Sequence, residues 1–353
     1  MTTNRKDEHV KNAEAQYAIQ RTDFEDLHFV HYSLSHQASD RIDLSTNLFN
    51  HDFKTPFYIN AMTGGSAWTK TINERFATVA RETGLAMASG SVSAAIKDPT
   101  VRDSFRVIRE INPEGFVIAN IGADRTAKQA KEAVELLEAN ALEIHLNTPQ
   151  EVVMPEGDRD FRHFEDHIRE MIQTIDLPII VKEVGFGMSQ ELMQDLHNLG
   201  IQAFDVSGNG GTNFVTIENA RRSAHEMNYL AEWGQSTAIS LLESQPLQRQ
   251  NVEIVASGGI KHPLQMAKAY ALGAKAVGMS GQFLHKVLND GIEATVQMVK
   301  DYEEQLRLIA LMLDVPKLAD FQNTDLVVSG YVAEWCARRQ IPIDYLAKRR
   351  LNH

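Results

Sequence analysis

The stretch that decides the fold reads Ala141-Leu142-Glu143-Ile144-His145-Leu146-Asn147. Its even-numbered residues are apolar and share one face at the strand period of two, while Glu143, His145 and Asn147 share the other. An open sheet with one face in water would produce this pattern. A barrel whose interior ends in a reaction chamber would also produce it, and the same change from apolar to polar recurs in other strand-like segments. We therefore expect a barrel.

Strand-like segments occur eight times at fairly even spacing, with helix-like stretches between most of them. The segments are Pro56–Met62, Leu85–Gly90, Phe116–Gly122, Ala141–Asn147, Pro178–Val184, Ala203–Gly208, Val252–Gly259 and Ala276–Gly281. The clearest helical stretches are Lys70–Thr83, Ala127–Ala139, Gln190–Leu199 and Pro263–Leu272, and helix-stopping glycines follow at Gly84, Gly200 and Gly273. Eight strand–helix units predict an α/β fold of the (β/α)₈ TIM-barrel type, with a doubly wound open sheet as the alternative.

Two further segments flank the predicted barrel. Residues 1–55 form a charged, mostly helical N-terminal extension that we expect to contribute to the active site, and residues 56–353 form the barrel with C-terminal closing helices. The longest gap between strands, Asn209–Asn251, contains a glycine-rich loop and a helix near Ser236–Glu243. Residues Ile292–Leu313 carry apolar side chains at helical spacing and predict a closing helix.

Composition excludes several classes of partner. The chain has 353 residues and a formal net charge of −12, so neither nucleic acid nor an anionic membrane is an expected partner, because both need a basic surface. The one cysteine, Cys336, cannot form a disulfide within the chain and favours a reducing compartment. With no apolar signal core at the N-terminus and no membrane-spanning apolar run, we expect a cytoplasmic enzyme.

Lys182 is the most informative single residue. It lies in the otherwise apolar strand 178–184, where an unpaired ammonium is costly, so an anion should face it. Glu183 is an awkward partner because adjacent strand residues point to opposite faces. Glycine-rich strand ends give the second signal: Ser257-Gly258-Gly259 and Ser280-Gly281 together favour a phosphate site.

Other polar residues leave alternatives open at this point. Glu151 could hold Mg²⁺ or be a solvated loop carboxylate. His145 could be a general acid or base, or a hydrogen-bonded core histidine. The cluster Arg5-Lys6-Asp7-Glu8-His9 has the appearance of a solvated helix face when taken alone.

Taken together, these motifs resemble one family, the type 2 isopentenyl-diphosphate Δ-isomerases. The matching stretches are Arg5-Lys6-x-Glu8-His9, Asn60–Gly65, Asn120–Ala123, His145-Leu146-Asn147-x-Pro149-Gln150-Glu151, Val181–Ser189, Gly210–Asn213, Trp233-Gly234 and Ser257–Gly259. The combination of the Lys182 and Gln150-Glu151 stretches is specific, whereas the glycine pairs are weak by themselves. The resemblance runs from near the N-terminus to the eighth strand.

The resemblance implies an FMN-containing barrel that needs Mg²⁺ and reduced flavin. It implies FMN contacts from the following residues: Ala61, Met62, Thr63, Ser91, Asn120, Lys182, Ser207, Thr212, Ser257, Gly258, Gly259, Ser280 and Gly281. The implied substrate contacts are Arg5, Lys6, Ser91, Val92, Ser93 and Gln150. Glu151 would hold Mg²⁺ against the diphosphate, and Gln150 and His145 are the candidate catalytic residues, with His145 better placed as a wall residue.

Two departures from the family pattern concern cations. Many members carry an arginine shortly after the serine that corresponds to Ser91, where this chain has Val92-Ser93-Ala94-Ala95. Many also carry an arginine after the glycines of the seventh strand, where Ile260-Lys261 stands here. The first departure shifts neutralisation of the diphosphate toward Arg5, Lys6 and Mg²⁺, and the second keeps a positive charge.

The implied reaction interconverts isopentenyl and dimethylallyl diphosphate by a 1,3-proton shift. No Asp/Glu pair is clearly placed for both proton transfers, so reduced FMN is the expected acid/base, with NADPH as its reductant. An FMN-dependent hydroxy-acid oxidase or dehydrogenase is the alternative, but that class resembles a His-Gly-Gly-Arg pattern that is absent from Gly208–Thr212. A barrel that binds flavin without chemistry is a third possibility. We also expect a homo-oligomer.

Overall fold

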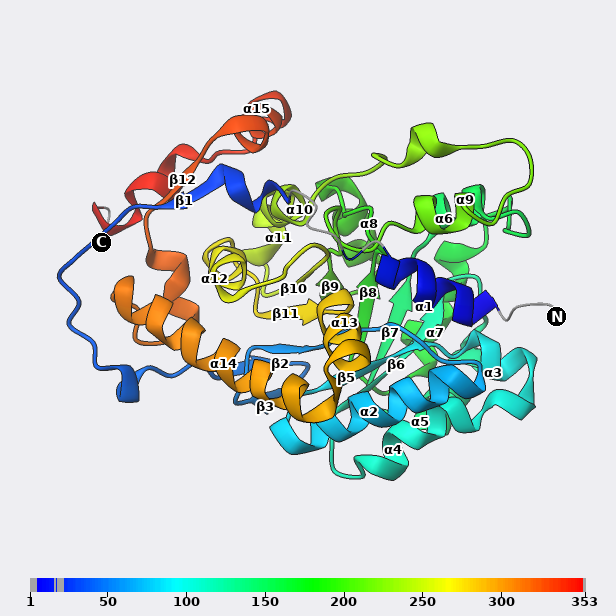
Figure 1. Cartoon of the computed structure of the whole chain (residues 1–353). Coiled ribbons are helices and arrows are strands. Elements are labelled where there is room, and N and C mark those ends of the chain that lie inside the picture. Colours follow the sequence, from blue (N-terminus) through cyan, green and yellow to red (C-terminus); the bar gives the residue numbers. More distant parts are fainter. Residues whose placement is uncertain (1–4, 16, 18–21, 352–353) are drawn as a thin grey trace.

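A computed structural model describes residues 5–15, 17 and 22–351, and its centre is a closed parallel barrel. The eight strands pair in sequence order, and the last closes onto the first. They are β4 (Phe57–Ile59), β5 (Met87–Ser91), β6 (Val117–Gly122), β7 (Ala141–His145), β8 (Ile179–Lys182), β9 (Ala203–Asp205), β10 (Glu253–Ser257) and β11 (Ala276–Met279). Figure 1 labels β5 to β11 among the surrounding helices. The barrel prediction is confirmed, and the open-sheet alternative is wrong because β11 pairs with β4.

Helices surround the barrel and extend beyond both of its ends. They are α1 (Arg5–Ala15), α2 (Ala67–Thr83), α3 (Ser93–Lys97), α4 (Asp103–Ile111), α5 (Ala127–Leu137), α6 (Thr148–Val153), α7 (Phe164–Thr174), α8 (Gln190–Leu199), α9 (Phe214–Asn219), α10 (Thr237–Glu243), α11 (Gln245–Gln248), α12 (Pro263–Ala271), α13 (Gly281–Asn289), α14 (Gly291–Met312) and α15 (Gly330–Arg339). The described residues also contain 3₁₀ segments: η1 (Asp23–Asp26), η2 (Ser39–Arg41), η3 (Pro99–Val101), η4 (Asn228–Leu230), η5 (Leu318–Asn323) and η6 (Asp344–Leu351).

Local sequence signals account for several helix boundaries. Ser66 caps α2 by accepting from the Thr69 amide, and Thr69 returns the bond in a capping box. Thr126 and Gln129 form the same box at the start of α5. The predicted stops at Gly84 and Gly200 are confirmed, since both adopt the left-handed conformation that ends α2 and α8.

The barrel interior has an apolar end and a polar end. Residues near the amino ends of the strands form one apolar cluster: Tyr58, Ala86, Ala88, Ile118, Ala141, Ile180, Ala203, Val255 and Ala276. The hairpin of β2 (Thr46–Leu48) and β3 (His51–Phe53) packs Leu48, Phe49 and Phe53 against this cluster. The hairpin therefore closes one end of the barrel, and the polar residues gather at the carboxyl ends of the strands.

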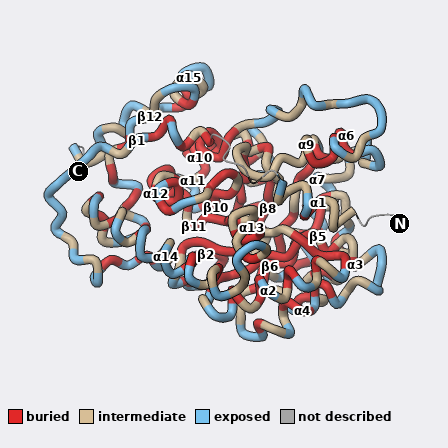
Figure 2. Tube along the Cα trace, in the orientation of Figure 1, coloured by how far each residue is buried: buried red, intermediate tan, exposed pale blue. Residues whose placement is uncertain are grey.

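The N-terminal extension is less helical than expected. Its described part contains α1, two 3₁₀ segments and three short strands, of which β1 (Leu27–Phe29) pairs antiparallel with β12 (Leu326–Val328). Figure 2 shows the burial concentrated in the barrel, with an exposed stretch between β1 and β2. The pairing of β1 with β12 ties the extension to the C-terminal segment, a contact that no local sequence pattern announces.

The C-terminal segment agrees with the expected closing helices. The predicted helix at Ile292–Leu313 is α14, which packs on α2 and α12, and α15 follows after β12. Cys336 on α15 is buried, and burial raises the pKa of its thiol to about 11. Within the described ranges, no helix has the length and apolar character needed to span a membrane.

Candidate active site

One large cavity opens at the carboxyl ends of the barrel strands, beneath α1. Its volume is about 560 Å³, which lies in the range of small-molecule and cofactor sites, roughly 300–1,000 Å³. It brings together most of the residues predicted from the sequence: Arg5, Lys6, Ala61, Met62, Ser91, Ser93, Asn120, His145, Gln150, Glu151, Lys182, Ser207, Thr212, Ser257, Gly258, Gly259, Ser280 and Gly281. Thr63 and Val92 are buried and do not line it.

The partner of Lys182 is a buried aspartate from the neighbouring strand. Lys182 Nζ donates to Asp205 Oδ2 at 2.8 Å and to Ser257 Oγ at 3.1 Å. Asp205 also accepts from Asn60 Nδ2 at 2.8 Å and from Ser257 Oγ at 2.6 Å. The expected anion opposite Lys182 is therefore part of the chain itself, and Glu183 does not take that role.

A second chain of polar groups crosses from β6 to β7. Asn120 Nδ2 donates to Glu143 Oε2 at 2.6 Å, and Asn120 Oδ1 lies 2.9 Å from His145 Nδ1. Burial raises the pKa of Glu143 to about 7, against the opposing effect of Lys182. The fixed amide orientation places the His145 proton on Nδ1.

His145 is a neutral imidazole at pH 7. Burial and the nearby cations Lys6, Lys182 and Arg125 lower its pKa to about 3. With Nδ1 directed at Asn120, the other ring nitrogen can accept a hydrogen bond but has no proton to give. This protonation state suits a wall residue rather than a general acid.

The glycine-rich strand ends form a cradle of bare backbone. Gly258 has φ +90°, and a Cβ there would lie 2.1 Å from the Gly208 carbonyl oxygen, so only glycine fits. Helix α13 begins at Gly281 directly after β11, and a Cβ built at Gly281 would stand 3.9 Å from Thr212 Oγ1. Close backbone approach beside a helix N-terminus is the chemistry of a phosphate site, so these residues fit the phosphate of FMN.

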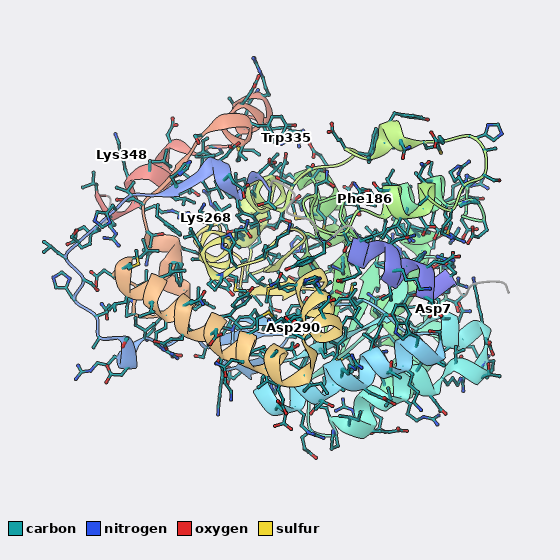
Figure 3. The ribbon with its side chains drawn as sticks, viewed as in Figure 1. Asp7, Phe186, Lys268, Asp290, Trp335 and Lys348 are labelled. Carbon is teal, nitrogen blue, oxygen red and sulfur yellow. The ribbon has the colours of Figure 1, made fainter. Side chains whose placement is uncertain are left out.

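Helix α1 spans the cavity mouth and is anchored on three sides. Asp7, which Figure 3 labels on α1, accepts from Ser66 Oγ at 2.5 Å, and Ser66 is the N-cap of α2. Glu8 lies 3.4 Å from Arg221, beyond α9. Glu14 Oε1 lies 2.6 Å from His285 Nδ1 on α13. The charged N-terminal cluster is therefore a docked cover over the cavity, not the solvated face that it resembles in isolation.

Glu218 on α9 connects this cover with Gln150. Its carboxylate accepts from Gln150 Nε2 at 2.8 Å and from Arg221 NH1 at 2.5 Å, and lies 3.0 Å from His9 Nε2. Burial alone would raise its pKa, but the bonds from His9, Gln150 and Arg221 outweigh burial and lower the pKa to about 2. A fully buried carboxylate thus fixes both the Gln150 amide and α1.

A cluster of cations lines the cavity, beside the carboxylates of Asp98, Asp124, Glu151, Glu156 and Asp158. Lys6 has its pKa lowered to about 8 by burial, with Arg5 and Lys97 adding repulsion, and Lys97 and Arg125 also line the cavity. Mutual repulsion among cations around one space is relieved when an anion binds there. The mouth is therefore suited to a polyanionic group such as a diphosphate.

Glu151 lies at the cavity edge with both oxygens engaged. Asn147 Nδ2 donates to one at 2.9 Å and the Asp158 amide donates to the other at 2.9 Å. In residues 5–15, 17 and 22–351, no cluster of three or more His, Cys, Asp or Glu could hold a metal ion. A single carboxylate fits Mg²⁺ only if water and substrate oxygens supply the other ligands, as is common for this ion.

The sequence did not single out several residues that shape this site. Asp205 and Glu218 organise it, and Lys97 and Arg125 add charge to the mouth. Asp205 could have been found from the sequence, because it is a charged residue at the end of an apolar strand, as Lys182 is. Glu218 carried no such signal, since it lies on a six-residue helix in the long gap after β9.

Comparison with known proteins decides the family. A family model described as FMN-dependent dehydrogenase matches residues 102–328. An isopentenyl-diphosphate delta-isomerase of Staphylococcus haemolyticus is 49% identical over 339 residues, which cover 96% of this chain and 97% of that protein. The chain belongs to the isopentenyl-diphosphate delta-isomerase family. A Staphylococcus aureus isopentenyl-diphosphate delta-isomerase has the same identity and coverage. Family membership confirms the resemblance drawn from the motifs, and the FMN-dependent dehydrogenase match supports FMN as the cofactor.

Solved structures agree with the fold of this isomerase family. Mandelate oxidase with (S)-2-phenylpropionate superposes with a TM-score of 0.66 at 15% identity, covering 93% of this chain and 95% of that chain. A flavocytochrome b2 mutant with benzoylformate gives a TM-score of 0.67 at 17% identity, covering 97% and 88%. At this identity the similarity shows a shared barrel and no more.

Proposed function

We propose that the protein is an isopentenyl-diphosphate Δ-isomerase that interconverts isopentenyl and dimethylallyl diphosphate by a 1,3-proton shift. The observation that carries the proposal is the 49% identity over 96% of the chain to an enzyme of that name. The matched length of 339 residues is sufficient to include the barrel and most of the N-terminal extension. The cations that line the cavity, together with the phosphate cradle, support a substrate with a diphosphate head.

Arg5 and Lys6 are the proposed ligands of the substrate diphosphate. Both line the cavity from α1, and Lys97 on α3 and Lys261 in the loop before α12 also line it. Ser91 and Ser93 offer hydroxyl donors at the same mouth, while the buried Val92 can contribute only backbone. Glu151 would hold Mg²⁺ against the diphosphate, which adds positive charge where the chain lacks the arginine that many family members carry shortly after the serine corresponding to Ser91.

The cradle around Gly258 and Gly281 would hold the FMN phosphate, and Lys182 would face the isoalloxazine. The other proposed flavin contacts that line the cavity include Ala61, Met62, Ser91, Asn120 and Ser207. Thr63, a further proposed flavin contact, is buried and does not line the cavity. When bound in reduced form, FMN supplies an electron-rich ring with an exchangeable proton.

The protein's own residues orient the reactants and exclude water. Gln150, held by Glu218, lines the cavity, where its amide would orient the alkene end of the substrate. His145 is a neutral wall group rather than a proton donor. The docked α1 excludes water from a transition state with cation character.

Four further features belong to the proposal. NADPH is the proposed reductant of FMN, the cytoplasm the proposed location and a homo-oligomer the proposed assembly. We also propose that residues 1–55 act as an extension that completes the site of the barrel in residues 56–353. Cavity-lining residues on α1 support this last point.

A two-by-two assay tests the proposal. Purified protein with FMN is supplied with isopentenyl diphosphate anaerobically, with FMN oxidised or reduced and with Mg²⁺ or excess chelator. Dimethylallyl diphosphate should appear only with reduced FMN and Mg²⁺ together. Oxygen consumption with 2-hydroxy acids and no isomerisation in any of the four conditions would instead identify a hydroxy-acid oxidase.

A further inference from the structure

The ion pair between Lys182 and Asp205 is built asymmetrically around the cavity. Lys182 lines the cavity, whereas Asp205 lies behind it, fully buried and outside the lining. The carboxylate accepts from Lys182 on β8, Asn60 beyond β4 and Ser257 on β10, and also from the Ser207 amide at 3.2 Å. These donors fix the position of the Asp205 carboxylate.

This arrangement restricts what Lys182 can do. An ammonium has three N–H groups, and two of them are directed at Asp205 Oδ2 and Ser257 Oγ. One N–H remains for a group in the cavity. A buried ion pair seldom stabilises a fold more than apolar residues of equal volume would. The next layer of the barrel interior is apolar, so apolar side chains would pack at this level as well. The pair therefore points to a role other than stability.

We propose that Asp205 is a positioning residue that fixes Lys182 Nζ against bound FMN and sets the net charge beneath the cofactor. The inference rests on FMN as the cofactor of the proposed function. Oxidised FMN has a neutral ring, whereas reduced FMN can carry a negative ring charge. The charge of the pair therefore governs how much more tightly the site binds the reduced form than the oxidised form.

The test measures this preference in four proteins: wild type, Lys182→Met, Asp205→Asn and the double variant. Dissociation constants for oxidised and reduced FMN are obtained anaerobically at pH 6, below the pKa of about 7 of the neighbouring Glu143. Lys182→Met leaves an uncompensated carboxylate, so the preference for reduced FMN should fall at least tenfold, about 30 mV for a two-electron couple. Asp205→Asn should raise the preference for reduced FMN. The double variant should regain most of the preference that Lys182→Met loses.

Glu183→Gln is the matched control. Glu183 is buried and adjacent in sequence, but it lies outside the cavity lining and takes the opposite face of the strand. Its pKa is raised to about 8 by burial, so the neutral amide mimics its state at pH 6 and the preference for reduced FMN should not change.

Two outcomes would overturn the inference. An unchanged preference in Asp205→Asn, even with a lower melting temperature, would reduce Asp205 to a strand-packing role. If Asp205→Asn does not fold, the double variant provides the test, because it carries no unpaired charge. An equal preference for reduced FMN in Lys182→Met and in the double variant would then overturn the inference. Neither measurement needs isomerase activity, so the inference survives a wild type that binds FMN without isomerising; a wild type that binds no FMN overturns the cofactor assignment as well.

Discussion

Replacement of Glu218 by glutamine should both destabilise the protein and weaken substrate binding. The substitution removes a buried charge that Arg221 and Gln150 bind and leaves an amide N–H facing donors. The pKa of Glu218 falls from 4.5 to about 2 on folding. At 1.36 kcal/mol per unit this corresponds to about 3 kcal/mol of stability at neutral pH, which is also the size expected for breaking a buried ion pair.

The expected shift in melting temperature follows from chain length. The unfolding entropy of 353 residues is about 0.7 kcal/mol/K, so about 3 kcal/mol lowers the melting temperature by roughly 4 °C at pH 7. Because the folded pKa of Glu218 is depressed, its contribution is present in full above about pH 4.5 and is lost as pH falls toward 2. The difference between wild type and variant should shrink over that interval.

Glu243→Gln separates the effect on substrate from the effect on stability. Glu243 is equally buried and binds Arg339 and Trp335, but it joins α10 to α15 outside the cavity lining. Both variants should melt earlier. Only Glu218→Gln should raise KM for isopentenyl diphosphate, by roughly tenfold or about 1.4 kcal/mol, because only it loosens α1. A melting shift below about 1 °C, or equal KM changes in both variants, would refute this reasoning.

Four further predictions concern single residues. Gln150→Ala should lower kcat by about 100-fold or more with FMN still bound, measured as turnover per bound flavin, and near-normal turnover would remove its assigned role. Glu151→Gln should raise the Mg²⁺ concentration for half-maximal activity about tenfold, with an unchanged requirement counting against the metal assignment. Lys6 has a pKa of about 8, so KM for the diphosphate should rise above pH 8 as its charge is lost, and Lys6→Arg should move that rise to higher pH; an identical profile in the variant would contradict it. Gly258→Ala should cost about 3 kcal/mol in melting experiments, since its Cβ would meet the Gly208 carbonyl, and a wild-type melting temperature would show that the loop adjusts.

The sequence predicted the barrel because strand periodicity and helix stops are local signals. All eight strand segments and the helices near Gly84 and Gly200 appear where the pattern indicated. The pairing of β1 with β12 was not predictable, because two three-residue strands about 300 residues apart carry no shared local pattern. The extension therefore seemed more helical than it is.

The candidate site was predictable in its parts and not in its connections. The apolar strand around Lys182 indicated that an anion should face its ammonium. The sequence pattern did not indicate that Asp205, which is paired with Lys182 on the adjacent strand, is that anion. The role of α1 followed only from the family resemblance, since its anchors on Ser66, Arg221 and His285 come from distant segments. Tertiary contacts of this kind leave no trace in composition or spacing.

The central claim, a proton shift with no net redox change, is tested most directly by turnover in D₂O. Isopentenyl diphosphate, Mg²⁺ and the protein with reduced FMN are incubated anaerobically, with the product followed by NMR and the flavin by absorbance. We expect dimethylallyl diphosphate that carries deuterium from solvent, formed over many turnovers while the flavin spectrum stays reduced. Product formed without deuterium, or flavin reoxidised in proportion to the substrate consumed, would contradict the account.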